Sequence, residues 1–135
     1  MLTVNVAFEK ESGLDAIDSL GDLTISDGIS TITIKTTYLD SWLAALVAGY
    51  NQTREADHVV LEISEEPQPL LIDVTPEGLL SISYENQTLA PQAPNNLKAG
   101  LRQAAESLLG AVDTLPDSQR NTFLDPIREF ISTTD

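Results

Sequence analysis

Three aspartates near the start of the chain have the spacing that most resembles a chemical site. Asp15, Asp18 and Asp22 recur at intervals of three and four residues, which would place their carboxylates on one side of a helical turn. Carboxylate oxygens are the ligands that Ca²⁺ and Mg²⁺ prefer. The spacing is not that of a calcium-binding loop, and a chain with 21 acidic residues forms such clusters freely. A carboxylate-based metal or small-ligand site at these residues, with or without enzyme activity, is therefore kept as an alternative hypothesis.

The groups needed for nucleophilic catalysis do not form a recognisable set in this sequence. The chain has one histidine, His58, no cysteine and no Gly-x-Ser-x-Gly turn, whereas a nucleophile needs a base beside it. The seven glycines are scattered and match no phosphate-binding loop. His58 follows an aspartate at the start of a predicted strand, where a solvated edge residue is the simpler interpretation. We therefore expect no enzyme activity and no cofactor.

The charge of the chain is strongly negative. Seven Lys and Arg residues oppose 21 Asp and Glu residues, which gives a net charge of −14. A field of this sign repels nucleic acid and anionic membranes and attracts basic partners. Acidity also serves solubility alone, and here the acids are dispersed along the chain. The sequence thus predicts no nucleic-acid or membrane partner, and leaves open whether the acidity is functional.

A strand that leads directly into an amphipathic helix carries the clearest structural signal. Residues 29–36 alternate between apolar and polar types, which places Ile32 and Ile34 on one face. An apolar stripe at helical spacing follows and must be buried, so this helix is predicted to cover one face of a sheet with Trp42 inside. The stripe consists of Leu39, Trp42, Leu43, Leu46, Val47 and Tyr50.

Two helix starts have candidate capping residues. Thr37 can accept the backbone N–H of Asp40, whose carboxylate favours the positive end of the first helix. Asn95 or Asn96 is predicted to cap the second helix, whose apolar stripe runs from Leu97 towards residue 112. Both helices are thus predicted to begin at locally specified positions.

The remaining segments complete an α+β pattern within a single domain over residues 1–135. The predicted fold is an antiparallel sheet of about six strands in two hairpin or meander units, with helices packed on one face in the order βββα-βββαα. Residues 85–96 hold two prolines and are predicted to be a loop, and residues 123–131 to be helical. The other alternating segments are residues 2–8, 23–25, 59–63, 70–74 and 80–84.

The repeated order of sheet and helix resembles the duplicated layout of small regulators that bind single-stranded nucleic acid. Residues 21–26 and 78–83 have similar sequences in the two halves. Such platforms stack bases on aromatic side chains and track the backbone with basic residues. The predicted outer sheet face has no Phe, Tyr or Trp and one lysine. The resemblance therefore implies, as an alternative, a divergent member of such a fold that has lost nucleic-acid binding.

The main hypothesis is a non-catalytic protein-interaction or regulatory module, such as an inhibitor, an immunity factor or an accessory subunit. Its partner is expected to be another protein, and a basic one fits the charge. The hypothesised surface is the outer face of the sheet, on which the charged anchors are Glu9, Lys35, His58, Glu62 and Asp73.

Assembly and location are predicted from more general features. A sheet built from two units has open edges, above all at residues 2–9, which favours a homodimer joined by an edge or by the C-terminal helices. The sequence has no recognisable export signal and no membrane-spanning run. The lack of cysteine fits a reducing compartment, so a cytoplasmic location is expected.

Overall fold

The structure is a computed structural model that describes residues 2–8, 20–63, 66–112 and 124–133. It confirms the predicted α+β class and the order of two strand units that are each followed by a helix. The first unit contains β1 (Thr3–Phe8), β2 (Leu20–Ser26), β3 (Thr31–Tyr38) and α1 (Leu39–Gln52). The second contains β4 (His58–Leu61), β5 (Leu70–Val74), β6 (Leu80–Tyr84), β7 (Gln87–Thr88), α2 (Pro94–Val112) and α3 (Leu124–Thr133).

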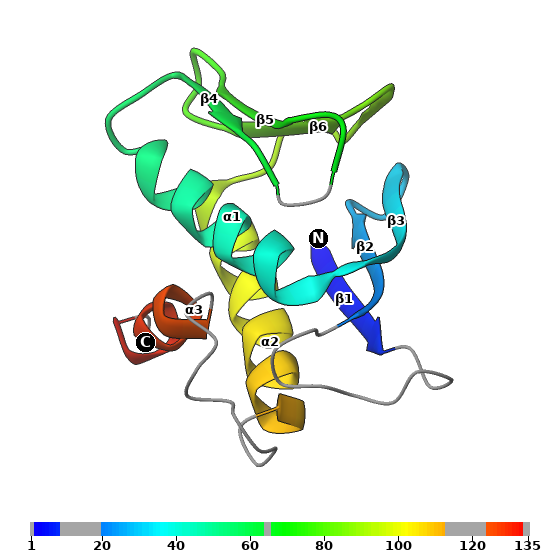
Figure 1. The fold of residues 1–135 in the computed structure, drawn as a ribbon. Coiled ribbons are helices and arrows are strands. Elements are labelled where there is room, and N and C mark those ends of the chain that lie inside the picture. The colour runs from blue at the N-terminus through cyan, green and yellow to red at the C-terminus, as the bar shows by residue number, and fades with distance from the viewer. Residues whose placement is uncertain (1, 9–19, 64–65, 113–123, 134–135) are drawn as a thin grey trace.

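The strands lie in two antiparallel sheets, whereas the sequence suggested one. The first sheet has the order β1-β2-β3 and the second the order β4-β5-β6-β7. They approach each other at β3 and β7, where the backbone N–H of Thr33 donates to the Gln87 side chain at 3.2 Å. Figure 1 shows α1 below the second sheet. The helices α2 and α3 pack on the side of α1 that faces away from this sheet, and the first sheet lies beside α1.

One apolar core fills the space between the two sheets and the helices. All six positions of the predicted α1 stripe are buried, and Trp42 is 0% exposed. The strand residues predicted to point inward are buried as well, and so are the described positions of the α2 stripe. The inward strand residues are Ile32, Ile34, Leu61, Ile72 and Ile82. The phase of each alternating segment was therefore predicted correctly.

The predicted capping box at the start of α1 is wrong. The N-cap residue is Tyr38, and among the described residues no side chain caps this end of the helix. The Thr37 hydroxyl instead donates to the Glu66 carboxylate at 2.5 Å and accepts the indole N–H of Trp42 at 3.0 Å. The Asp40 carboxylate accepts the backbone N–H of the next residue. Thr37 thus binds a partner 29 residues away in sequence, which a local pattern does not reveal.

The predicted loop at residues 85–96 also differs in its details. The helix α2 begins at Pro94, so Asn95 and Asn96 lie in its first turn and do not cap it. Proline fits the first helical position because the backbone N–H there has no partner within the helix. The short strand β7 pairs with the end of β6, and Gln92 forms an isolated bridge with Leu80. This segment therefore extends the second sheet before the helix begins.

A chain of hydrogen bonds links the start of α1 to the second sheet. The hydroxyl of Tyr84, at the end of β6, donates to the same Glu66 carboxylate at 2.9 Å. The Tyr84 ring also meets the Trp42 ring edge to face, with centroids 5.0 Å apart. Burial and the hydrogen bond to Glu66 raise the pKa of Tyr84 above its usual range. Tyr84 therefore stays protonated and keeps donating at neutral pH.

The Asp27 carboxylate forms hydrogen bonds that connect the β2–β3 hairpin to the segment before α2. One carboxylate oxygen accepts the backbone N–H groups of Ser30 at 2.6 Å and Ile29 at 2.7 Å. The other accepts the N–H of Ala90 at 2.7 Å. Gly28 takes the positive φ of 96° that this turn requires. The hydrogen bonds from Ser30, Ala90 and Ile29 lower the pKa of Asp27 from its ordinary value.

Replacing Asp27 by asparagine is expected to destabilise the protein at neutral pH and to matter little in acid. The amide keeps one acceptor oxygen, so it cannot serve both the hairpin and Ala90. Because the folded pKa of Asp27 is depressed, its contribution is present above the unfolded value of about 4 and is lost as pH falls through the folded value.

Urea denaturation of both proteins at neutral pH and near pH 3 measures this difference. The control is Asp57→Asn. Asp57 is exposed, and among the described residues only its backbone carbonyl, not its carboxylate, forms a hydrogen bond. This substitution should therefore leave stability nearly unchanged. A loss of equal size at both pH values would show that the Asp27 carboxylate does not act through its charge.

Candidate interaction surface

The outer face of β4 and β5 combines an exposed apolar centre with charged flanks. Alternation along β4 turns Val59 and Leu61 into the core and His58 and Val60 outward. Val60 lies opposite Leu71 on β5 and is 51% exposed. We define the β4 face as the outward residues of this region, which are His58, Val60, Glu62, Leu71 and Asp73.

A hydrogen-bonded pair of polar side chains lies beside the apolar centre of the β4 face. His58 and Asp73 are directly opposite each other, and the Nδ1 atom of His58 hydrogen bonds to the Oδ1 atom of Asp73. Both side chains are exposed, at 63% and 47%. Exposed pairs stabilise folded proteins by at most about 1 kcal/mol. The pair therefore fixes the orientation of the His58 ring and the Asp73 carboxylate and adds little to stability.

The backbone of β4 has one unpaired edge in the described part of the chain. The carbonyl of Asp57 accepts the N–H of Val74 at 2.8 Å, so Asp57 faces β5. In an antiparallel ladder every second residue faces the same neighbour, so Val59 and Leu61 also bond to β5. The N–H and C=O groups of His58 and Val60 point the other way. No described strand pairs with β4 on that side, which is the outer edge of the second sheet (Figure 1).

The surroundings of this edge are acidic. Glu55 and Asp57 precede β4, and Glu62 follows it. All three are exposed, and the partly exposed Asp73 adds a fourth carboxylate on the neighbouring strand. The edge therefore combines unpaired backbone groups, one exposed valine and a negative potential.

The structure brings together some of the predicted anchors and separates others. His58 and Asp73 are in contact, and Glu62 lies just beyond the end of β4. Lys35 is exposed on β3, which belongs to the other sheet. Glu9 lies outside the described residues. The anchors on the described strands are thus divided between two surfaces.

The predicted metal set is covered by the structure only at Asp22. Asp15 and Asp18 lie outside the described residues. Asp22 accepts the backbone N–H of Thr36 at 2.8 Å, at an irregularity in the β2–β3 pairing where Thr36 has a positive φ of 50°. Within the described ranges, no three His, Cys, Asp or Glu residues gather in a way that could hold a metal ion. The observed contact gives Asp22 a structural role.

Two features of possible functional weight were not picked out from the sequence. Val60 falls in the polar phase of the alternating segment 59–63, and an apolar residue at such a position is a signal for a contact site. Arg54 and Lys98 line one cleft, yet Arg54 lies in the turn after α1, Lys98 lies in α2, and the two show no common motif. The first could have been found by inspection of the pattern, and the second required the packing of α1 against α2.

Comparisons with protein-family models, with curated proteins and with solved structures gave no match for this chain. Within the ranges that the structure describes, no helix has both the length and the apolar character needed to cross a membrane. Inferences about function therefore depend on the geometry of the residues themselves.

Proposed function

We propose that this protein is a non-catalytic interaction module that binds an extended, basic segment of another protein along the free edge of β4. The observation that carries the proposal is the outward-facing backbone of His58 and Val60 beside an exposed apolar side chain. In strand addition, main-chain hydrogen bonds supply affinity and alternate side chains supply specificity. The partner segment would become a fifth strand of the second sheet.

Charge determines which segments fit this edge. The chain carries a net charge of −14, and carboxylates at Asp57, Glu62 and Asp73 lie close to the edge. Lysine or arginine side chains on the face of the incoming strand that continues the β4 face would meet these acids and lay their alkyl stems beside Val60. The apolar residues of that strand would point to the opposite face, which Val59 and Leu61 share. Long-range attraction would also speed encounter at low salt. An extended segment that alternates basic and apolar residues is therefore the partner chemistry we propose.

Self-pairing of β4 is the competing occupant of the same edge. An antiparallel pair centred on Val60 would place His58 of one copy opposite Glu62 of the other, which sets an imidazole donor beside a carboxylate acceptor. Two chains of net charge −14 repel each other at low salt, which disfavours this arrangement. Sedimentation at high micromolar concentration that gives the monomer mass of 14.6 kDa would exclude the homodimer.

Reversing two charges of the β4 face is expected to slow binding of a basic strand. The probe is a synthetic octapeptide that alternates lysine and valine, and the variant is Glu62→Lys with Asp73→Lys. We expect the association rate to fall about fivefold at low salt, and the effect to fade in 1 M salt, where screening acts within about 3 Å. Surface plasmon resonance at both salt concentrations measures the rates.

The matched control reverses Glu106 on α2 and Glu129 on α3, which gives the same net charge away from the β4 face. This control should slow association much less than the Glu62 and Asp73 variant does. Equal effects of the two double variants would show that the probe senses total charge, and would contradict a site at β4.

A further inference from the structure

A cleft among the three helices has features that the proposed strand-binding edge does not use. It has a volume of about 540 Å³ and lies between the end of α1, the start of α2 and α3. Its apolar side includes Tyr50, Pro126 and Phe130, and its charged side chains are Arg54, Lys98 and Glu129. We call this space the helix cleft. Its size is typical of sites that bind small molecules.

The helix cleft holds two of the few cations that this acidic chain contains. Five of the seven Lys and Arg residues lie in the described ranges. Arg102 pairs with Glu106 and Arg128 pairs with Asp125, each within its own helix, while Lys35 is on β3. Arg54 and Lys98 both line the cleft, and neither forms an ion pair with another described residue. Among its described lining residues, the cleft thus gathers two cations against the one carboxylate of Glu129.

Aromatic packing fixes the geometry of one of these cations. The guanidinium carbon of Arg54 lies 5.6 Å from the centre of the Tyr50 ring. Tyr50 in turn meets Phe130 edge to face, with centroids 5.9 Å apart. A guanidinium held on an aromatic face keeps its N–H edge available for two parallel hydrogen bonds to a carboxylate. Arg54 is therefore placed to receive an anion at the mouth of the cleft.

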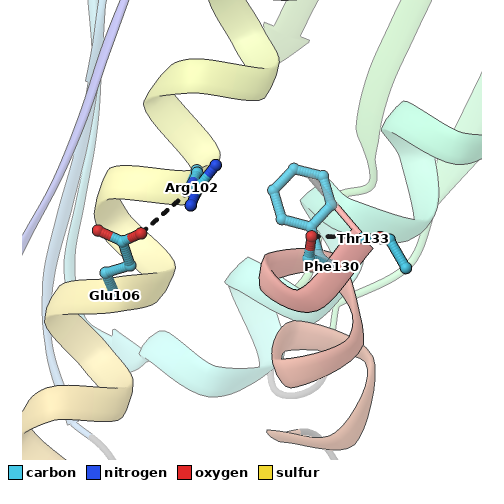
Figure 2. A network of polar contacts seen from close by, with 4 residues as sticks. All are labelled: Arg102, Glu106, Phe130 and Thr133. Atoms are coloured by element: carbon cyan, nitrogen blue, oxygen red, sulfur yellow. Dashed lines mark hydrogen bonds and ion pairs between the residues drawn. The ribbon is translucent and has the colours of Figure 1, made fainter. Parts of the chain in front are cut away.

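Figure 2 shows how the neighbouring polar groups are already occupied. Arg102 is joined to Glu106 along α2 at 3.0 Å. On α3, the Thr133 hydroxyl donates to the carbonyl of Phe130 at 3.3 Å. These contacts run within single helices. An anion in the cleft would accordingly depend on Arg54 and Lys98.

We propose that the helix cleft binds a small organic monoanion in which a carboxylate is attached to an apolar body. Arg54 and Lys98 receive the carboxylate, and Tyr50, Pro126 and Phe130 contact the apolar part. Glu129 disfavours ligands with a second negative charge, because like charges in one cleft repel. This site is separate from the β4 edge, so the result of the strand-binding experiments does not affect this proposal.

Titration of the ¹⁵N-labelled full chain with sodium benzoate tests the proposal by NMR. We expect saturable shifts of the amides of Asn51, Lys98 and Phe130, which lie at the cleft. Neutral benzamide and inorganic phosphate should each bind several-fold more weakly, since one lacks the charge and the other lacks the apolar body. Arg54→Gln and Lys98→Gln should each weaken benzoate binding about fivefold, as expected for a partly exposed charge.

Two further variants keep the test decisive. Glu129→Gln removes the like charge and should tighten benzoate binding, which a general loss of structure would not do. Lys35→Gln removes a cation outside the cleft and should leave benzoate binding unchanged. Benzamide binding as tight as that of benzoate, an equal loss in Lys35→Gln, or no saturable shift at the cleft would each overturn the proposal.

Discussion

Replacing Trp42 by alanine is expected to lower the free energy of unfolding by about 3–5 kcal/mol. The side chain is 0% exposed and lies edge to face on Tyr84. Its indole N–H donates to Thr37, so the substitution leaves both a cavity and an altered hydrogen-bond chain to Glu66. A loss of this size is a large part of the roughly 5–15 kcal/mol that stabilises a typical domain.

Urea denaturation followed by far-ultraviolet circular dichroism measures this loss, because the variant has no tryptophan fluorescence. Trp42→Phe loses the N–H donor but keeps an aromatic ring that fills most of the space. It should therefore be less destabilising than Trp42→Ala. Ile29 is 94% exposed at the tip of the hairpin, and Ile29→Ala should change stability by less than about 0.5 kcal/mol. An unchanged denaturation midpoint for Trp42→Ala would contradict the core described above.

Adding a single methyl group at Gly21 is expected to lower the free energy of unfolding by about 3 kcal/mol, the upper part of the usual range for overpacking. A Cβ atom at this position in β2 would lie 2.2 Å from the backbone carbonyl oxygen of Ala7 in β1. It would also lie 2.9 Å from a methyl carbon of Leu39. A backbone carbonyl cannot rotate aside as a side chain does, so β1 itself must shift.

The same substitution at Gly110 is a control with the opposite expected sign. Gly110 lies in α2, and a Cβ atom there would meet no described atom within 4 Å outside its own helix backbone. Alanine favours a helix interior over glycine by up to about 1 kcal/mol, so Gly110→Ala should stabilise the protein. Denaturation of the two variants side by side gives the comparison. A Gly21→Ala protein as stable as Gly110→Ala would show that β1 and β2 do not approach in this way.

The sequence was sufficient to predict which side of each element is buried. The phase of alternation places Ile32 and Ile72 inward, and the helical spacing places Trp42 in the core. It was not sufficient to predict that the strands divide into two sheets. A period of two residues reports the buried face of a strand, whereas its neighbours depend on long-range contacts such as that between Thr33 and Gln87.

The candidate sites were predicted less completely for the same reason. His58 and Asp73 were chosen as separate anchors, and only the pairing of β4 with β5 makes them a pair. Arg54 and Lys98 become neighbours of one cleft because α1 packs against α2. Charge and residue type can be read locally, but convergence of side chains follows from tertiary packing.

Amide hydrogen exchange in the presence of the alternating lysine and valine octapeptide tests the proposed strand binding most directly. At saturation, the account predicts that exchange of the His58 and Val60 amides slows about tenfold or more, because their N–H groups face the free edge. The amides of Val59 and Leu61 already face β5 and should change little. Equal protection of all four amides, or no protection of His58 and Val60, would contradict strand addition at β4.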